Sequence, residues 1–148
     1  MSIQWTWRAG ALTNAEGYEL ASVRDGVLAT AAGERLALES SLASSSPRFF
    51  LRAQTAAGEH FSVTQAGITV TRLRATCADR EYLLERRNPF RRERRIVARV
   101  AGAEVASTAP AGDGLRVSVG VGELPELDAI FLSYACLLLD ATPRTLRT

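Results

Sequence analysis

Near its end the chain reads ELDAIFLSYACLLLD over residues 126–140. Between Glu126 and Asp140, over residues 127–139, the only clearly polar side chains are those of Asp128 and Ser133, so a helix formed by this segment has no polar face to turn toward water. Packed on one face of an open sheet, such a helix would leave several large side chains wet, at a cost of ~1.5 to 3 kcal/mol each. The segment therefore predicts a helix from about residue 125 to residue 140 that the rest of the chain encloses.

The preceding part of the chain, residues 3–122, alternates apolar and polar side chains in short runs, which is typical of half-buried antiparallel strands. About eleven runs can be distinguished. Connections such as Asp25-Gly26 and Ala101-Gly102 supply the positive φ that tight hairpins require. Weaker patterns predict a strand over residues 68–74, with a bulge or corner inside it, and a long break over residues 109–114.

Together these patterns predict a mainly β fold with one domain over residues 1–148. It is a closed antiparallel β-barrel of about 11–12 strands, residues about 3–122, around a buried C-terminal hydrophobic α-helix, residues about 125–140. The composition agrees, because 148 residues with 47% hydrophobic side chains suffice for one globular domain with its own core. Trp5 and Trp7 are expected in that core rather than at a membrane surface.

The charge balance is mild, because 18 basic residues, all of them arginine, face 16 acidic ones and leave a net charge of +2. This total neither requires nor excludes a polyanionic partner, so only the placement of the arginines is informative. The densest run is RRNPFRRERR, residues 86–95, at a predicted hairpin tip. Guanidinium groups suit phosphate, and an aromatic ring among them can insert at a lipid interface or stack on a base. The predicted anion- or lipid-binding residues are therefore Arg86, Arg87, Phe90, Arg91, Arg92, Arg94 and Arg95.

The same run also has a purely structural interpretation. It can be a solvated turn whose arginines pair with Glu81, Glu85 and Glu93. Surface ion pairs of this kind contribute little to stability and carry no function of their own. The sequence leaves the two interpretations open.

Two acidic residues of the predicted helix need partners. Asp140 lies at the carboxyl end, where the helix macrodipole disfavours negative charge, and Arg144 or Arg147 is predicted to fold back onto it. Asp128 lies near the amino end and is expected to be satisfied by backbone donors or by an arginine. Both acids are therefore expected to have structural roles.

Candidates for catalysis or metal binding are few. His60, the only histidine, lies on the polar face of a predicted strand, and no G-x-S-x-G nucleophile turn is present. Cys77, in a predicted loop, and Cys136, in the predicted helix, have no second Cys or His at ligand spacing. No disulfide, metal or cofactor site is predicted, both thiols are expected to be free, and a non-catalytic role is favoured over an enzymatic one.

The location follows from what the sequence lacks. Its first ten residues do not have the basic and then apolar pattern of a signal peptide. The longest apolar segment, residues 129–139, is shorter than the about 20 residues that a membrane-spanning helix needs. We expect a cytoplasmic protein with no transmembrane segment, peripheral to a membrane if its arginines bind one, and the oligomeric state is left open.

A strand meander followed by an apolar helix bracketed by Glu126 and Asp140 resembles the tubby C-terminal-like superfamily, which includes the phospholipid scramblases and the LURP-one-related proteins. The segment Tyr82-Leu83-Leu84, followed by a polar turn and Ile96-Val97-Ala98-Arg99-Val100, is similar to that family in layout. The resemblance implies a non-enzymatic barrel closed around its C-terminal helix. It also implies membrane-associated roles, which are phosphoinositide binding in tubby proteins and attachment through a separate anchoring helix in scramblases.

The chain departs from that family in ways that bear on function. It has no lysine for a mixed basic phosphoinositide pocket, no cysteine-rich palmitoylation segment and no spanning helix. No ligand-binding residue of the family can be carried over to a position here, and scrambling activity is not implied.

The hypothesis that follows is a non-catalytic β-barrel binding module, which meets anionic membrane lipid or a protein partner through the Arg-rich hairpin. The alternative is a small-ligand-binding or enzymatic barrel with a cavity at the barrel mouth. A nucleic-acid partner is disfavoured, because the net charge is only +2 and aromatic residues are not interleaved through the basic run.

Overall fold

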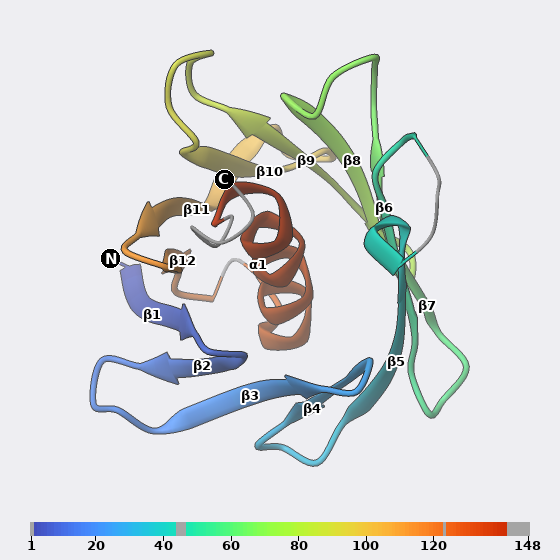
Figure 1. The fold of residues 1–148 in the computed structure, drawn as a ribbon, viewed down its shortest axis with the longest axis vertical. Coiled ribbons are helices and arrows are strands. Elements are labelled where there is room, and N and C mark those ends of the chain that lie inside the picture. Colours follow the sequence, from blue (N-terminus) through green and yellow to red (C-terminus); the bar gives the residue numbers. More distant parts are fainter. Residues whose placement is uncertain (1, 44–46, 123, 142–148) are drawn as a thin grey trace.

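The computed structural model describes residues 2–43, 47–122 and 124–141. They form twelve strands, a short 3-10 helix and one α-helix (Figure 1). The elements are β1 Ser2–Arg8, β2 Ala11–Asn14, β3 Glu19–Arg24, β4 Val27–Thr30, β5 Arg35–Ser40, the 3-10 helix Ser41–Ala43, β6 Phe50–Gln54, β7 His60–Gln65, β8 Arg72–Cys77, β9 Arg80–Arg86, β10 Arg94–Ala98, β11 Ala103–Ala111, β12 Gly114–Gly120 and α1 Glu126–Asp140.

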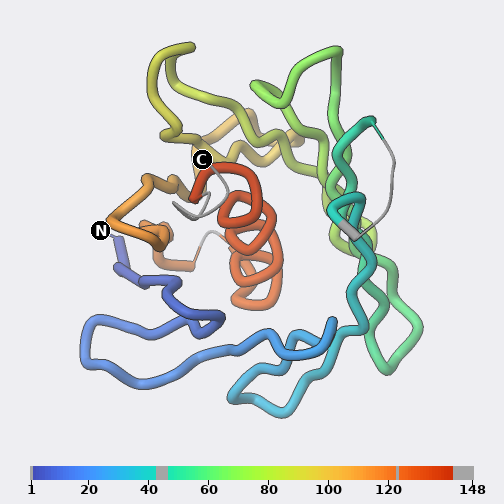
Figure 2. The backbone as a smooth tube through the Cα atoms, viewed as in Figure 1, coloured from blue at the N-terminus to red at the C-terminus, as the bar shows by residue number. Residues whose placement is uncertain are grey.

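The sheet is a closed antiparallel barrel in which each strand pairs with the next along the chain. The barrel closes where β1 pairs with β12, with Trp5 opposite Val117 and Trp7 opposite Leu115. Figure 2 shows the backbone passing once around α1, from the blue N-terminal strand back to the orange strands beside it. The predicted fold class, a mainly β closed barrel of about 11–12 strands with a C-terminal helix, is confirmed.

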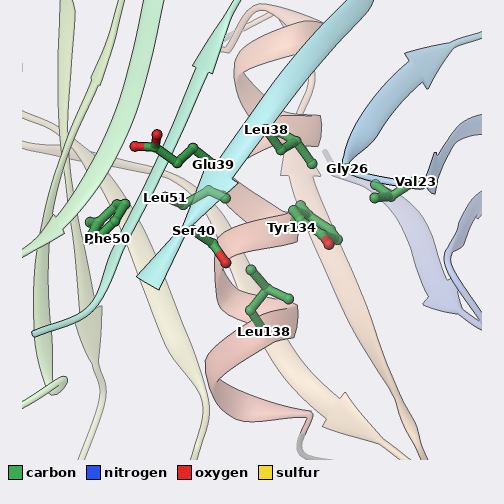
Figure 3. Close-up of a pocket in the computed structure, with 9 residues that line it drawn as sticks. All are labelled: Val23, Gly26, Leu38, Glu39, Ser40, Phe50, Leu51, Tyr134 and Leu138. Carbon is green, nitrogen blue, oxygen red and sulfur yellow. The ribbon is translucent and has the colours of Figure 1, made fainter. Parts of the chain in front are cut away.

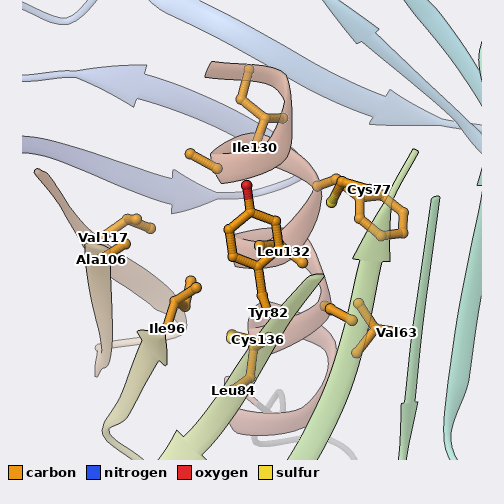
Figure 4. Close-up of a cluster of buried hydrophobic side chains, with 14 of the residues drawn as sticks. Val63, Cys77, Tyr82, Leu84, Ile96, Ala106, Val117, Ile130, Leu132 and Cys136 are labelled. Carbon is orange, nitrogen blue, oxygen red and sulfur yellow. The ribbon is translucent and has the colours of Figure 1, made fainter. Parts of the chain in front are cut away.

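Inward-facing side chains from the strands meet α1 in a single core. Phe131 of α1 packs edge-on against Phe61 of β7, with 5.4 Å between ring centroids. The buried indole nitrogen of Trp7 donates a hydrogen bond to Ser133 Oγ at 2.8 Å, so one polar residue of the helix is satisfied by the barrel wall. Trp5 is buried as well, which confirms the predicted core position of both tryptophans. Figure 4 shows part of this cluster on the side of β8, β9 and β10.

The helix is not covered equally on all sides. Its residues from Asp128 to Ser133 are buried, but Tyr134, Leu137, Leu138 and Leu139 remain half-buried. The last two turns are therefore covered on one side, where Ala135, Cys136 and Asp140 are buried, and only half-buried on the other. The reason is geometric: an eight-stranded barrel is already filled by side chains, whereas twelve strands enclose more space than one helix of about 10–12 Å diameter occupies. α1 packs mainly against β7, β11 and β12, and the space that it leaves lies toward β3–β6, whose residues line a pocket with the helix.

Local differences from the sequence prediction have simple causes. Residues 66–71 form an irregular connection rather than the start of a strand, and β8 begins only at Arg72. The bulge or corner predicted inside residues 68–74 corresponds to this connection. β11 continues through Pro110 to Ala111, so the predicted long break shrinks to the two residues 112–113. Cys77 is the buried last residue of β8 and not a loop residue.

Buried thiol and phenol groups make the stability of the fold sensitive to alkaline pH. Burial raises the pKa of the Cys136 thiol to about 12, and burial raises the pKa of Cys77, Tyr82 and Tyr134 in the same direction. Well below pH 9, which is the ordinary pKa of a thiol, these groups hold their protons in both the folded and the unfolded state. Above pH 9, the unfolded chain releases protons that the folded chain retains, so the free energy of unfolding falls as the pH rises.

We therefore expect the free energy of unfolding to fall steadily between pH 9 and pH 12, by a few kcal/mol in all. Urea titrations followed by circular dichroism on either side of pH 9 measure it. The variant Cys136→Ala should show a shallower fall than the native chain. A stability that stays flat across this range would contradict the burial of these groups.

Candidate functional site

The connections between strands alternate between the two ends of the barrel. One end holds the neighbouring connections 41–49, 66–71 and 87–93 together with the carboxyl end of α1. We call this the basic end, because these three connections carry Arg48, Arg87, Arg91 and Arg92 against a single acidic residue, Glu93. The connections of the opposite end carry Glu16, Glu34, Glu59 and Asp79 and a single arginine, Arg99. The other connections of the basic end, 9–10, 25–26 and 112–113, add Asp25 and Asp113 and no arginine. The basic charge is therefore confined to one side of that end, whereas the opposite end is acidic.

The predicted Arg-rich site divides into an inner and an outer part. Arg94, the first residue of β10, points inward and is 0% exposed, and Arg86, the last residue of β9, is half-buried. The remaining predicted residues, Arg87, Phe90, Arg91, Arg92 and Arg95, are exposed. Strand alternation explains the split between Arg94 and its neighbour, since successive side chains of a strand face opposite sides of the sheet.

The inner part is a buried ion pair with the end of α1. Arg94 holds Asp140 through two bonds, Nε to Oδ2 at 2.5 Å and Nη2 to Oδ1 at 3.1 Å, and both side chains are fully buried. Arg86 adds a longer contact to Asp140 Oδ1 at 3.5 Å, and Arg92 donates to the Asp140 backbone carbonyl at 3.5 Å. Arginines at this position also suit the negative end of the helix macrodipole.

These partners of Asp140 differ from the predicted ones. Arg144 and Arg147 lie outside the described residues, and the arginines that hold Asp140 belong to the run that the sequence assigned to a surface tip. Nη1 of Arg94 and Nε of Arg86 have no hydrogen-bond partner in the described part of the chain. The two guanidinium groups therefore offer more N–H donors than the carboxylate of Asp140 can accept.

A second ion pair holds the amino end of the same helix. Arg80, at the start of β9, donates to both oxygens of Asp128, at 2.7 and 2.9 Å, and the Tyr82 hydroxyl donates to Asp128 Oδ2 at 2.6 Å. The hydrogen bond to Asp128 raises the pKa of Arg80. The expectation that an arginine satisfies Asp128 is confirmed. Asp128 and Asp140 therefore fix α1 to the β9–β10 hairpin, Asp128 at the start of β9 and Asp140 where β9 ends and β10 begins.

The outer part of the site lies at the tip of the β9–β10 hairpin. Phe90 is 93% exposed, and its backbone N–H donates to Asn88 Oδ1 at 2.9 Å, which fixes the turn that carries it. Arg87 pairs with Glu104 at 2.7 Å and Arg95 pairs with Glu85 at 3.2 Å, as the structural interpretation of the run predicts in part. Arg91 makes no ion pair within the described residues.

Sequence reasoning missed a second apolar tip on the neighbouring connection. Ile68 is 93% exposed on a braced loop, in which Arg48 donates to the carbonyls of Gln65 and Gly67 at 3.3 and 2.9 Å. The Arg86 N–H donates to the Thr71 carbonyl at 2.9 Å and joins this loop to the start of the hairpin. Both connections project beyond the barrel at the top of Figure 1. The alternation of Ile68 with Val70 had indicated a strand, which concealed the loop.

A pocket of about 530 Å³ lies in the space between α1 and β3–β6. Its walls come from both sides, with Tyr134 and Leu138 on the helix facing Leu38 and Leu51 on the strands (Figure 3). His60 does not line it, and lies exposed at the start of β7 near the acidic end. The convergence of His60 with carboxylates that an enzymatic barrel would need is therefore not found in this pocket.

The described residues contain no group of His, Cys, Asp and Glu side chains that could hold a metal ion. Within the same residues, no helix is long and apolar enough to cross a membrane.

No protein-family model and no curated protein sequence matches the chain. Among solved structures, the X-ray structure of a protein from Arabidopsis thaliana matches 93% of this chain and 89% of that chain, with a TM-score of 0.58 and 16% sequence identity. The two chains therefore share a β-barrel fold. At 16% identity the match concerns the fold alone, and it assigns no family to the chain and no function to any residue.

Proposed function

We propose that the chain is a non-catalytic docking module that binds anionic membrane surfaces reversibly through its basic end. The observation that carries the proposal is the pair Phe90 and Ile68, each 93% exposed at the tip of neighbouring, braced connections. Two separate apolar tips flanked by Arg87, Arg91 and Arg92 suit a fluid lipid interface better than a protein surface, which more often meets a continuous apolar patch.

The expected strength follows from the groups involved. Each exposed arginine near an anionic surface contributes about 1 kcal/mol. Full burial of a Phe or Ile side chain contributes ~1.5 to 3 kcal/mol. Two tips and three arginines together support reversible adsorption and not permanent anchoring. The acidic residues of the opposite end favour an orientation in which that end faces away from the membrane.

Co-sedimentation with vesicles of phosphatidylcholine, with and without phosphatidylserine, tests the proposal. We expect adsorption only with phosphatidylserine, and weaker adsorption as salt rises. The double variant Phe90→Ser/Ile68→Ser should weaken it by at least about tenfold, which corresponds to about 1.4 kcal/mol. The variant Arg91→Gln should weaken it about fivefold, because one exposed arginine contributes about 1 kcal/mol near an anionic surface. Its melting temperature should change little, because Arg91 is exposed and makes no ion pair within the described residues.

The matched controls come from the acidic end. Val100 is 100% exposed at the tip of the β10–β11 connection, and Arg99 lies beside it. Val100→Ser and Arg99→Gln should leave adsorption unchanged. If these variants reduce adsorption as much as those of the basic end, or if the native chain does not bind anionic vesicles, the proposal is wrong.

A further inference from the structure

The space beside α1 opens toward the same end of the barrel as the two apolar tips. The pocket of about 530 Å³ is bounded by Gly26, in the β3–β4 connection, and by Ser40, the last residue of β5, and both lie at the basic end. Leu138 places the last turns of α1 against it. Its volume falls within the range of about 300–1,000 Å³ that is usual for small-molecule sites.

The chemistry of the lining is mainly apolar. Inward-facing Val23, Leu38 and Leu51 of the strands face Tyr134 and Leu138 of the helix (Figure 3). The one acidic lining residue, Glu39, is exposed and its carboxylate pairs with Arg52 at 2.9 Å. A charged or strongly polar ligand would therefore find no unpaired charge in the described lining to compensate its loss of water.

Two hydroxyl groups complete the site. The Tyr134 and Ser40 hydroxyls line the pocket, and neither makes a hydrogen bond within the described residues. Tyr134 is held in place because its ring packs on the Trp7 ring, with 5.4 Å between centroids. Apolar walls with few polar groups are typical of sites that orient an amphiphile.

We propose that this pocket binds a single long acyl chain, with the polar head of the amphiphile left at the basic end. The half-buried apolar side chains of Tyr134 and Leu138 then lose their remaining exposure to water when the chain enters. The pocket is separate from the apolar tips Phe90 and Ile68, so the proposal stands or falls independently of membrane docking. Binding of this kind differs from recognition of a lipid headgroup, because the acyl chain of the ligand makes the contacts with the pocket.

The position of Trp7 provides the readout. Because its ring packs on a residue that lines the pocket, a bromine-labelled chain inside the pocket should quench tryptophan fluorescence. In the first arm, the native chain is titrated with dibromostearic acid in the absence of vesicles. In the second arm, it meets vesicles of dibrominated phosphatidylcholine and phosphatidylserine. We expect saturable quenching in at least one arm, which unlabelled stearic acid competes away.

Affinity in the first arm should rise about threefold to fourfold for each added methylene, and stop rising once the chain fills the pocket. Quenching by the free acid alone identifies a soluble amphiphile as the source, and quenching by the phospholipid identifies a membrane chain. Either result supports the site. Quenching in neither arm, or affinity that rises without limit as chain length increases, overturns the proposal.

Two substitutions in β5 distinguish acyl-chain binding in the pocket from binding on the outer surface of the barrel. Leu38→Phe fills the pocket and should weaken binding of the acyl chain at least about tenfold. Ala37→Phe places the same side chain on the outward face of the same strand and should leave binding unchanged. If Leu38→Phe lowers the melting temperature sharply, Val23→Leu provides a milder filling of the same space. Quenching that none of these fillings reduces would place the labelled chain elsewhere and overturn the assignment.

Docking and pocket binding fail differently. Phe90→Ser/Ile68→Ser should bind free stearic acid as the native chain does, although it no longer adsorbs to vesicles. Leu38→Phe should adsorb to phosphatidylserine vesicles normally. The loss of one property without the other therefore shows which proposal is wrong.

Discussion

Replacement of Asp140 by Asn is expected to lower the free energy of unfolding by about 3–5 kcal/mol. The substitution keeps the size of the side chain but removes the carboxylate that pairs with fully buried Arg94. Arg94 cannot return to water without moving β10, because it begins that strand inside the barrel. Chemical denaturation in urea, with the native chain alongside, measures the change.

The other end of α1 supplies the comparison. Asp128→Asn removes a similar double contact, but its partner Arg80 is 41% exposed and can return to solvent, so the loss should be smaller. The paired variant Arg94→Met/Asp140→Leu replaces both buried charges by apolar groups and should recover most of the lost stability. A loss for Asp140→Asn no larger than that for Asp128→Asn would show that the buried pair does not hold the helix.

Gly114→Ala is expected to cost about 3 kcal/mol, through a clash and not through backbone freedom. Gly114 begins β12, where that strand meets β1, and a Cβ there would overlap the backbone carbonyl oxygen of Trp7. Only backbone movement at the β1–β12 junction could relieve the overlap, and that junction closes the barrel. Thermal unfolding should show a lower melting temperature and a broader transition.

Gly67→Ala is the matched control, since its Cβ would meet nothing within 4 Å and no positive φ is required there. This substitution should be neutral or slightly stabilising, because it reduces the freedom of the unfolded chain. An equal effect of the two substitutions would refute the close approach at Gly114.

The sequence predicts those parts of the fold that depend on neighbouring residues. Period-two alternation predicts the strands, and the absence of a polar face predicts a helix surrounded by them. What it cannot predict is how much of the interior the helix fills, because that depends on strand number and tilt. The half-exposed Tyr134 and Leu138, and the pocket beside them, follow from this mismatch.

In the candidate site, too, the sequence predicts the local features and not those that depend on the whole fold. The Arg-rich run is visible as composition, but the inward direction of Arg94 depends on where β10 begins, and an error of one residue reverses it. Its partner Asp140 lies far along the chain, so no local pattern links the two. Ile68 lies outside any recognisable motif, and its exposure becomes evident only when the β7–β8 connection is seen to leave the barrel wall.

The pairing of the first strand with the last has a consequence for synthesis. While the ribosome is still making the chain, β1 has no partner on one edge, and the emerging meander is an open sheet whose apolar face has nothing to cover it. The barrel cannot close until β12 has been translated, and α1, which packs inside the barrel, is made after β12. Contacts this distant along the chain form slowly, so the nascent protein passes through a stage in which association with other chains competes with its own completion.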